Sequence, residues 1–184
     1  YYRAAALSHI CRFISNYHVE NGRLPVSIWN KVAFFPGTFD PFTLSHKGIV
    51  RAIRDMGYEV YLAIDEFSWS KNTQPHLVRR QIVSMSVADM FHVHLFPDEI
   101  PVNIANPSDL ARLKAVFPGR EVYLVVGSDV IAGASAYTAP PRENSVHNMN
   151  HIVFRRASQS EREVDHQRDP KDFITGKVVE LELP

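Results

Sequence analysis

The chain has 184 residues, 45% of them hydrophobic, and its 20 basic residues balance its 20 acidic ones. This length and composition predict one compact core, and the zero net charge argues against a nucleic-acid partner, because such proteins usually carry a basic excess. No apolar run reaches the roughly 20 residues that cross a bilayer, so no membrane partner is expected, and the single cysteine, Cys11, allows no intramolecular disulfide and favours the cytoplasm.

The first predicted element is a helix over residues 2–19. It carries an apolar stripe at helical spacing, made by Leu7, Ile10, Cys11, Ile14 and Tyr17. Residues 21–25 contain Asn-Gly and Pro, which are typical of a connector. We therefore divide the chain into an N-terminal helix and connector, residues 1–30, and a main domain, residues 31–184. Two interpretations of the helix stay open, a packing element and the end of a preceding fused domain.

Strands and helices alternate from Lys31 onward. The predicted strands cover residues 31–36, 58–64, 92–96, 121–126, 151–155 and 177–183, and the predicted helices cover 43–56, 77–90 and 107–117. Asn106 and Pro107 are typical of the first positions of a helix. The alternation predicts an α/β fold, with parallel βαβ units in a doubly wound sheet. In such sheets ligands bind beyond the carboxyl ends of the strands, where the strand order reverses.

The first predicted strand leads through the turn Gly37-Thr38-Phe39-Asp40 into a helix. Gly37 has no Cβ atom to obstruct a ligand that approaches the backbone. Thr43 is the expected N-cap, because its hydroxyl can accept from the backbone N–H of residue 46. Free N–H groups and the positive end of the helix dipole favour an anionic phosphate here, and the ring of His46 can donate to a phosphoryl oxygen. The same residues also fit an ordinary strand-to-helix turn with a surface histidine.

Residues 37–46 together resemble the signature of the nucleotidyltransferase superfamily, Gly-Thr/Ser-Phe-Asp-Pro-x-His/Thr-x-Gly-His. Gly37, Thr38, Phe39, Asp40, Pro41, Thr43 and His46 match it, and Ser45 stands where the family has Gly. The resemblance implies a Rossmann-like fold with strand order 3-2-1-4-5, and a turn whose backbone binds phosphate. The Ser45 side chain is expected to narrow the pocket or to add a hydroxyl contact.

Residues 64–71 follow the second predicted strand and precede Arg79 and Arg80. They resemble the part of the same superfamily in which a lysine and a helical arginine reach the substrate phosphates. The resemblance assigns such contacts to Lys71 and, of the two arginines, to Arg80, and both residue types suit phosphate. Trp69 can stack on a base or pack within its loop. The Asp-Glu-Phe-x-x-x-Lys form over residues 65–71 is closer to cytidylyltransferases, so ATP and CTP both stay open.

The turn Gly127-Ser128-Asp129 follows the fourth predicted strand. Together with Tyr137 and the strand that ends before Arg156, it is similar to nicotinate mononucleotide adenylyltransferases. The resemblance implies that this region holds the acceptor nucleotide and part of ATP, with Asp129 at ribose or adenosine and Arg156 near phosphate or the acceptor. In the implied strand order this turn and the turn at residues 37–40 line one crevice. By itself the sequence also fits an ordinary helix cap.

The histidine pairs, a polar segment and the end of the chain give three further expectations. His92 and His94, like His147 and His151, lack a third ligand at a convincing spacing, so no metal site is predicted. Residues 155–172 are mainly polar and are expected to form a surface loop. The resembled family has an Ile-Ser-Ser-Thr-x-x-Arg segment after its last strand. We expect this phosphate-binding segment to lie beyond residue 184 in a longer protein.

The expected activity is nucleotidyl transfer, in which a phosphorylated acceptor attacks the α-phosphorus of a nucleoside triphosphate and releases pyrophosphate. ATP with Mg²⁺ on its phosphates, and an acceptor such as nicotinate mononucleotide, are the leading substrates. The expected catalytic residues are His46, Thr43 and Lys71, and the expected nucleotide-binding residues are Gly37, Thr38, Phe39, Asp40, Ser45, Arg80, Gly127, Asp129 and Arg156. The alternatives are a cytidylyltransferase acting on a phosphorylated alcohol and a non-catalytic nucleotide-binding module. The sequence sets no oligomeric state.

Overall fold

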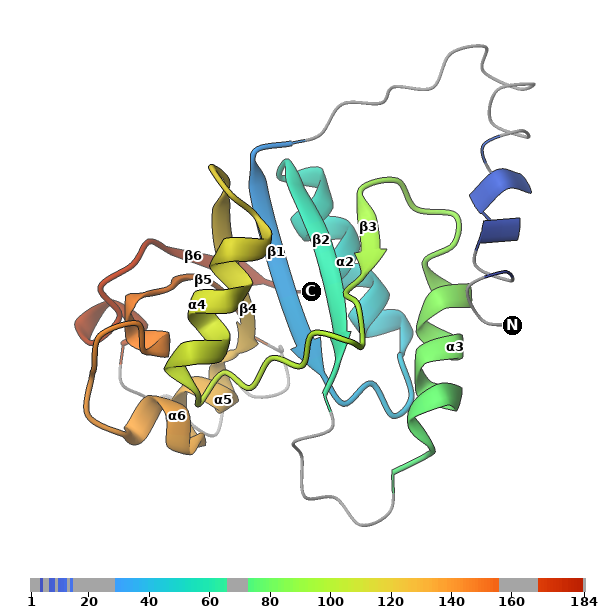
Figure 1. Cartoon of the computed structure of the whole chain (residues 1–184). Helices are drawn as coiled ribbons and strands as arrows, with labels where there is room; N and C mark the ends of the chain where they lie inside the picture. Colours follow the sequence, from blue (N-terminus) through green and yellow to red (C-terminus); the bar gives the residue numbers. More distant parts are fainter. Residues whose placement is uncertain are drawn as a thin grey trace.

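A parallel β-sheet forms the centre of the computed structural model (Figure 1). The structure describes residues 29–65, 73–155 and 169–183, together with residues 4, 7, 8, 10–12 and 14. Within these ranges the sheet has six strands in the order β3-β2-β1-β4-β5-β6, and every neighbouring pair is parallel. The strands are β1 (Lys31–Gly37), β2 (Tyr58–Ile64), β3 (Val93–Leu95), β4 (Glu121–Gly127), β5 (Asn150–Arg155) and β6 (Val178–Glu182). The expected order is confirmed, and β6 extends it beside β5.

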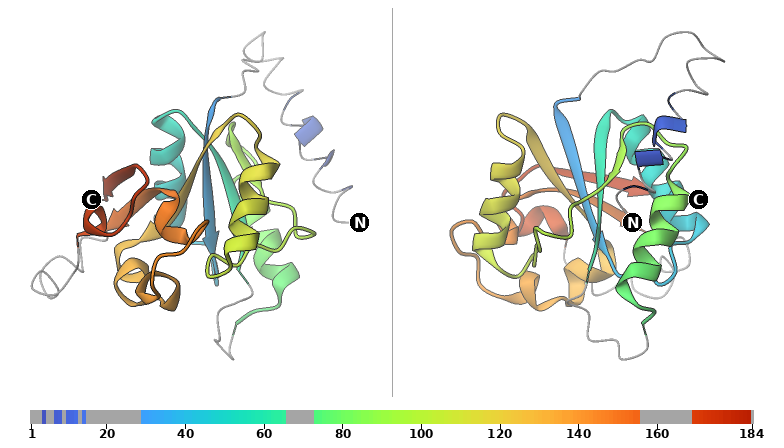
Figure 2. Two further views of the ribbon diagram at one scale, coloured as in Figure 1. Left: turned by 60° about the vertical axis from the view of Figure 1, so that its left-hand side comes forward. Right: turned by 45° about the vertical axis from the view of Figure 1, so that its right-hand side comes forward.

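Helices cover both faces of the sheet. They are α2 (Leu44–Asp55), α3 (His76–Ser86), α4 (Pro107–Val116), α5 (Ser128–Gly133) and α6 (Ser135–Thr138), with 3₁₀ turns η1 (Val146–Asn148) and η3 (Pro170–Asp172). The α2 and α3 helices pack into one apolar cluster, whereas α4, α5, α6 and η1 pack into another. Figure 2 shows α2 and α4 on opposite sides of the strands.

The two clusters follow from alternation along buried strands. Val32 and Phe34 of β1 enter the cluster of α4, whereas Ala33 and Phe35 enter that of α2, and none of the four is more than 3% exposed. Successive side chains of a strand point to opposite faces, so a parallel strand with helices on both faces has a continuous apolar run. The site-bearing strands β1 and β4 are both of this kind.

Some predicted boundaries and elements differ from the structure. The α3 helix ends at Ser86 instead of continuing to residue 90, and the Ser86 hydroxyl donates to the carbonyl of Ile82 at 2.7 Å. Such bonds to the backbone compete with helix continuation. The short helices α5 and α6 were not predicted, because helices of six and four residues carry too little apolar periodicity.

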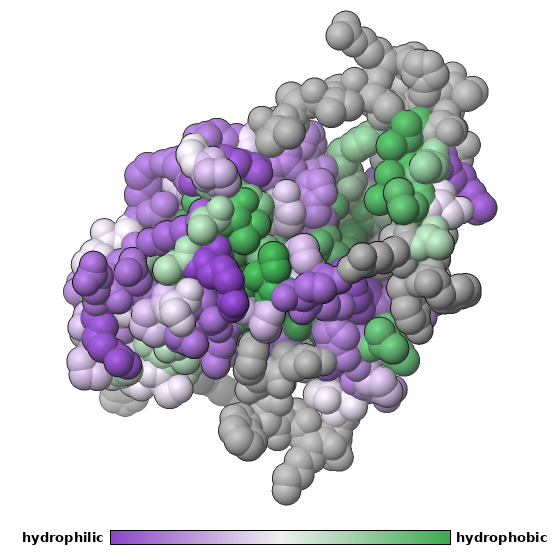
Figure 3. All heavy atoms as spheres, viewed as in Figure 1, coloured by the Kyte–Doolittle hydropathy of each residue, from purple (hydrophilic) through white to green (hydrophobic). Residues whose placement is uncertain are grey.

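The outer surface is uneven in polarity. Figure 3 shows a mainly hydrophilic surface on the side of α4, whereas apolar side chains gather toward α3 and the described part of the N-terminal helix. Those on α3 include Leu77, Val78 and Met85. The described residues between 4 and 14 are helical, as predicted, but the connector at residues 21–25 lies outside the described ranges. No described helix combines the length and the apolar character needed to cross a membrane.

Candidate functional site

The strand order reverses between β1 and β4, because β2 and β3 lie on one side of β1 and β4 to β6 lie on the other. The pairing of β1 with β2 continues to Gly37↔Ile64, and that of β4 with β5 continues to Gly127↔Phe154. The pairing of β1 with β4 stops at Phe34↔Leu124, although both strands continue to their glycines. The two strands therefore stop pairing just before the turns that follow them. We call this place the β1/β4 opening, and it is the switch point at which doubly wound sheets bind ligands.

The turn after β1 is built around the ring of Phe39. Phe39 is 3% exposed and has a φ angle of 48°, in the left-handed region that side chains rarely adopt. A Cβ atom at Gly37 would come within 2.8 Å of the Phe39 ring. The glycine thus makes room for the protein's own phenyl ring, and its expected contact with a ligand stays a prediction. The ring is a fixed support for the backbone of residues 38–40.

The first turn of α2 holds Thr43 and His46 in a reciprocal cap. The Thr43 hydroxyl accepts from the backbone N–H of His46 at 3.4 Å, which confirms Thr43 as the N-cap. The backbone N–H of Thr43 donates to Nδ1 of His46 at 3.0 Å. Since Nδ1 accepts this hydrogen bond, a neutral His46 ring carries its own proton on Nε2. The Thr43 hydroxyl also lies 2.9 Å from Nδ1.

Aromatic contacts fix the plane of the His46 ring. It stacks on Phe42 at a centroid distance of 5.5 Å and meets the Phe39 ring edge to face at 5.3 Å. Phe42 and Phe39 are both buried. The position and tautomer of the imidazole are therefore set before any substrate arrives, as a catalytic hydrogen-bond donor requires.

Arg79 braces the same turn from α3. Its guanidinium donates to the carbonyls of Thr38 and Gln74, each at 2.9 Å, and to that of Asp65 at 3.3 Å. Arg79 is only 5% exposed. Sequence reasoning missed this role and preferred Arg80. The buried Val83 and Val87 lie four and eight residues further on, a spacing that places residue 79 on the sheet-facing side of the helix.

Arg80 belongs to α3, and its guanidinium reaches the end of β3, on the far side of β2 from the β1/β4 opening. Its guanidinium donates to the Phe96 carbonyl at 3.2 Å and to the Asp98 carboxylate at 3.0 Å. The structure therefore does not bring Arg80 together with Gly37 or His46. The Asp40 carboxylate links the turn to the segment before α3, because it accepts from the backbone N–H of Gln74 at 3.1 Å.

The turn after β4 reaches the same edge of the sheet. Gly127 ends β4 and precedes α5, whose first turn contains the exposed Asp129. A Cβ atom at Gly127 would collide with the Asp129 carboxylate, so the glycine lets that side chain turn back over the end of the strand. Ser45 is exposed in the first turn of α2. Lys71 and Arg156 lie outside the described residues.

A buried polar network joins the start of β5 to α6 and η1. Tyr137 of α6 places its hydroxyl 2.9 Å from Nε2 of His151, whose Nδ1 donates to the Met149 carbonyl at 2.7 Å. His147 donates from Nε2 to the Tyr137 carbonyl at 3.1 Å, and its Nδ1 lies 3.1 Å from the Ser145 hydroxyl. Burial lowers the pKa of His151 to about 4 and raises the pKa of Tyr137. Both side chains are therefore uncharged at neutral pH.

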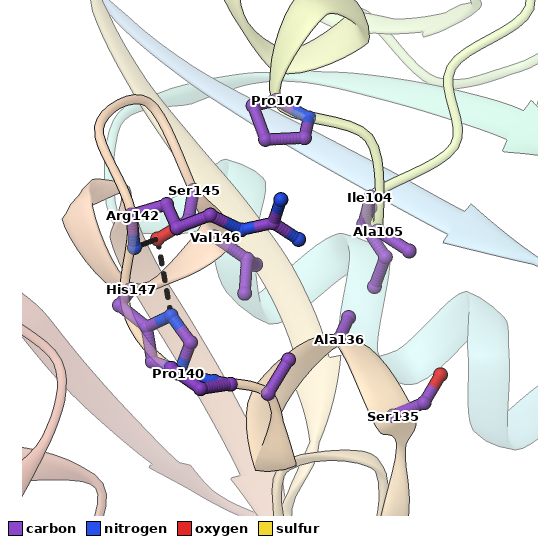
Figure 4. A pocket seen from close by; sticks show the side chains of 11 residues that line it. Ile104, Ala105, Pro107, Ser135, Ala136, Pro140, Arg142, Ser145, Val146 and His147 are labelled. Carbon is purple, nitrogen blue, oxygen red and sulfur yellow. Dashed lines mark hydrogen bonds between the residues drawn. The ribbon is translucent and has the colours of Figure 1, made fainter.

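Two residues of this network, Ser145 and His147, line a pocket of about 250 Å³. The pocket lies between the start of α4 and the segment from α6 to η1 (Figure 4). Its walls are polar and apolar in nearly equal measure, and Arg142 reaches across it. Sequence reasoning did not find this pocket, because its walls come from segments about thirty residues apart that carry no motif.

A second histidine cluster lies at the opposite edge of the sheet. The buried Glu59 of β2 lies 2.6 Å from Nδ1 of His92 and 2.8 Å from Nε2 of His94. The sequence analysis saw no third group near this pair, because Glu59 is brought there only by the pairing of β2 with β3. The carboxylate oxygens bond the ring nitrogens directly. Among the described residues no set of three such side chains is arranged to hold a metal ion.

Comparison with known proteins places the fold. No family model and no curated protein matches the sequence. Among solved structures, nicotinic acid mononucleotide adenylyltransferase from Plasmodium falciparum, complexed with NaAD, superposes with a TM-score of 0.61 at 16% identity, over 84% of this chain and 76% of that one. The same enzyme complexed with APC gives 0.59 at 16% identity, over 84% and 75%. A putative nicotinate-nucleotide adenylyltransferase from Vibrio parahaemolyticus gives 0.54 at 16% identity, over 78% and 77%. The chain therefore has the fold of these adenylyltransferases.

Proposed function

We propose that the chain is a nucleotidyltransferase that transfers a nucleoside monophosphate, AMP from ATP in the first instance, to a phosphorylated acceptor and releases pyrophosphate. The observation that carries this proposal is the Thr43–His46 cap at the start of α2, beside the β1/β4 opening. It offers a preorganised imidazole and a helix N-terminus at the place where this class of sheet binds ligands.

The chemistry needs no covalent intermediate. A phosphate oxygen of the acceptor attacks the α-phosphorus in line, the bond to the β-phosphate oxygen breaks, and pyrophosphate leaves with that electron pair. Negative charge grows on the non-bridging oxygens, where Nε2–H of His46 donates and the positive end of α2 adds to the stabilisation. The Thr43 hydroxyl, which lies 2.9 Å from Nδ1, holds the ring in place. Mg²⁺ enters as part of the triphosphate substrate, whose oxygens are the ligands it prefers.

The other expected residues complete this proposal. The backbone of Thr38 and Phe39 positions the phosphates, and Asp129 contacts ribose at the end of β4. Lys71 and Arg156 are proposed to neutralise phosphate charge, as the family resemblance implies. Nicotinic acid mononucleotide is the leading acceptor, because two of the structural neighbours are named for it.

A pyrophosphate-release assay tests the proposal. The chain is incubated with ATP or CTP, Mg²⁺ and a panel of acceptors that includes nicotinic acid mononucleotide and phosphorylated alcohols. Release with ATP and the mononucleotide is the expected result. Release only with CTP and a phosphorylated alcohol would replace the proposal by a cytidylyltransferase. Nucleotide binding without any release would replace it by a non-catalytic nucleotide-binding module, to which Ser45 in place of the family's glycine gives some support.

A further inference from the structure

The exposed apolar side chains of the described residues gather on two helical faces. Nine large hydrophobic side chains are exposed among these residues, and six of the nine lie on the N-terminal helix and on α3. They are Leu7, Ile10 and Ile14, and Leu77, Val78 and Met85. Single exposed apolar side chains are ordinary, whereas several on one face mark a surface that binds another surface.

The outer face of α3 carries no charge. The exposed residues of this helix are Leu77, Val78, Gln81 and Met85, and we call them the α3 face. At 3.6 residues per turn they lie within about 100° of one another around the helix axis. The arginines of α3 are used elsewhere, since one is buried against the turn after β1 and the other pairs with Asp98. Helix faces in solvent usually carry charged side chains, so the α3 face is expected to be covered.

The described part of the N-terminal helix offers a matching face. Leu7, Cys11 and Ile14 recur at helical spacing and are exposed, and with Ile10 they form what we call the N-terminal stripe. Its ends are seven residues apart in the sequence, and the α3 face likewise extends over two turns. Seven helical residues span about 10 Å. The two faces are therefore of equal length and can pack along each other.

The charges near the two faces have opposite signs. Residues 1–19 contain Arg3 and Arg12 and no acidic residue. The C-terminal end of α3 carries the negative end of the helix dipole, and Asp89 follows it with a side chain that is 70% exposed. Asp89 also lies 3.4 Å from Lys47. A basic helix is therefore attracted toward this end of α3.

The root of the N-terminal segment is fixed near the same end of α3. The ring of Trp29 stacks on His92 at 3.7 Å, and its carbonyl accepts from Arg120 at 2.6 Å. His92 lies six positions after Ser86, where α3 ends. Figures 1 and 2 show the described part of the N-terminal helix on the side of α3 in each view. The chain thus presents both faces on one side of the molecule.

Neither face covers the other within one chain, because the six large apolar side chains are 40% to 63% exposed. We propose that two copies of the chain associate through these faces, with the N-terminal stripe of each copy packed on the α3 face of the other. One two-fold axis then buries both faces of both copies, which doubles the apolar area that a single helix pair would bury. The inference does not depend on the proposed function, because none of these residues belongs to the proposed site.

The oligomeric state tests this interface. Light scattering over a concentration series should show a dimer for the unmodified chain. Leu7→Glu and Met85→Glu each place a charge against an apolar surface and should raise the dimer dissociation constant at least about tenfold. Met56→Glu is the matched control, because Met56 is 42% exposed at the end of α2 and belongs to neither face. Circular dichroism checks that each variant is folded, as substitutions at exposed positions should be.

Three results would overturn the inference. They are a chain that stays monomeric at every concentration, a dimer that either Leu7→Glu or Met85→Glu leaves intact, and an equal loss in Met56→Glu. Pyrophosphate release is not part of this test, so its outcome leaves the proposed function as it stands.

Cross-linking distinguishes a second copy from the chain's own helix. Cys11 is the single cysteine and lies exposed on the N-terminal stripe. The unmodified chain is mixed with a tagged Cys11→Ser, Gln81→Cys variant of larger mass and mildly oxidised. A reducible heterodimer is the expected product, whereas a tagged Cys11→Ser, Lys114→Cys control, altered at an exposed position of α4, should give little. Equal yields for the two would contradict the interface. An intrachain disulfide without any dimer in the Gln81→Cys variant that keeps Cys11 would show that the helix covers its own chain, and would overturn the exchange.

Discussion

At the scale of single residues, the central feature is the fixed tautomer of His46. Its Nδ1 accepts from the backbone N–H of Thr43 at 3.0 Å, so the ring presents an N–H at Nε2. A neutral imidazole that exchanged between its two tautomers would carry its proton on Nδ1 for part of the time, and Nε2 would then have no N–H to donate. The capping interaction at the start of α2 thus serves both the helix and the proposed chemistry.

His46→Ala is expected to lower kcat for pyrophosphate release about a hundredfold, or roughly 3 kcal/mol, because it removes one preorganised donor. Thr43→Val should destabilise the chain by about 1 kcal/mol through loss of the cap, with a smaller fall in kcat. Lys47→Ala is the control, since this next residue pairs with Asp89 at the surface. Steady-state kinetics and urea denaturation measure these effects, and an unchanged kcat for His46→Ala would remove the residue from the mechanism.

At the scale of elements, α3 holds the turn after β1 through one buried side chain. The Arg79 guanidinium joins the carbonyls of Thr38, Asp65 and Gln74, which come from three separate segments. The turn that is proposed to bind phosphate is therefore held by an arginine whose hydrogen bonds to the described residues go to carbonyl groups.

Arg79→Met is expected to lower the free energy of unfolding by about 2 to 3 kcal/mol, because buried carbonyl groups lose a charged donor. The matched variant Arg80→Met removes a half-exposed ion pair with Asp98 and should cost less than about 1 kcal/mol. Urea denaturation measures both, and hydrogen exchange should show faster opening of residues 38–40 in Arg79→Met alone. Equal losses of stability would contradict the bracing role, and a higher KM for ATP in Arg80→Met would support the sequence-based assignment of that residue.

At the scale of the whole molecule, the two edges of the sheet differ in role. The carboxyl edge carries both turns of the proposed site, whereas the amino edge carries the buried carboxylate of Glu59 between His92 and His94. Glu59 also accepts from the backbone N–H of Trp29, whose ring stacks on His92 at 3.7 Å. Trp29 is therefore fastened to the strands just before β1 begins.

The contacts of Glu59 are expected to make the free energy of unfolding of the chain depend on pH. Burial by itself raises the pKa of Glu59, but hydrogen bonds from His92, His94 and the Trp29 N–H outweigh it and hold the pKa below its usual value. A carboxylate with a lowered pKa in the folded state contributes stability above its unfolded pKa, and this contribution disappears as the pH falls through the folded pKa. Glu59→Gln should therefore lower the free energy of unfolding by about 2 kcal/mol at pH 7. The difference from the unmodified chain should shrink at pH values below about 4.

Urea denaturation at several pH values measures this effect. Glu180→Gln is the control, because Glu180 pairs with Arg155 on the surface across 3.9 Å and should change stability little at any pH. A deficit in Glu59→Gln that stayed constant down to acid pH would show that the buried carboxylate contributes by packing and not by its charge.

The sequence by itself determined the α/β class of the fold and the cap at the start of α2, whereas the strand order was an expectation from the family resemblance. Mainly apolar runs at residues 31–36, 58–64 and 121–126 indicated buried parallel strands, because burial on both faces favours apolar side chains at successive positions. Thr43 could be predicted as an N-cap, because a cap depends on residues within a few positions of one another. Residues 127–129 were expected as a turn, and they are the end of β4 and the first residues of α5. The apolar runs and the cap are local features, so the sequence displays them directly.

Only the tertiary structure decided which side chains meet across the chain. The bond from Arg79 to Thr38 spans 41 residues and the contact of Glu59 with His94 spans 35, and neither spacing carries a periodic signal. The same holds for Gly37, whose missing Cβ accommodates Phe39, and for the Arg142 pocket, whose walls start at residues 104 and 135. Such contacts are set by strand order and register, which bring distant segments together only after the whole sheet has formed.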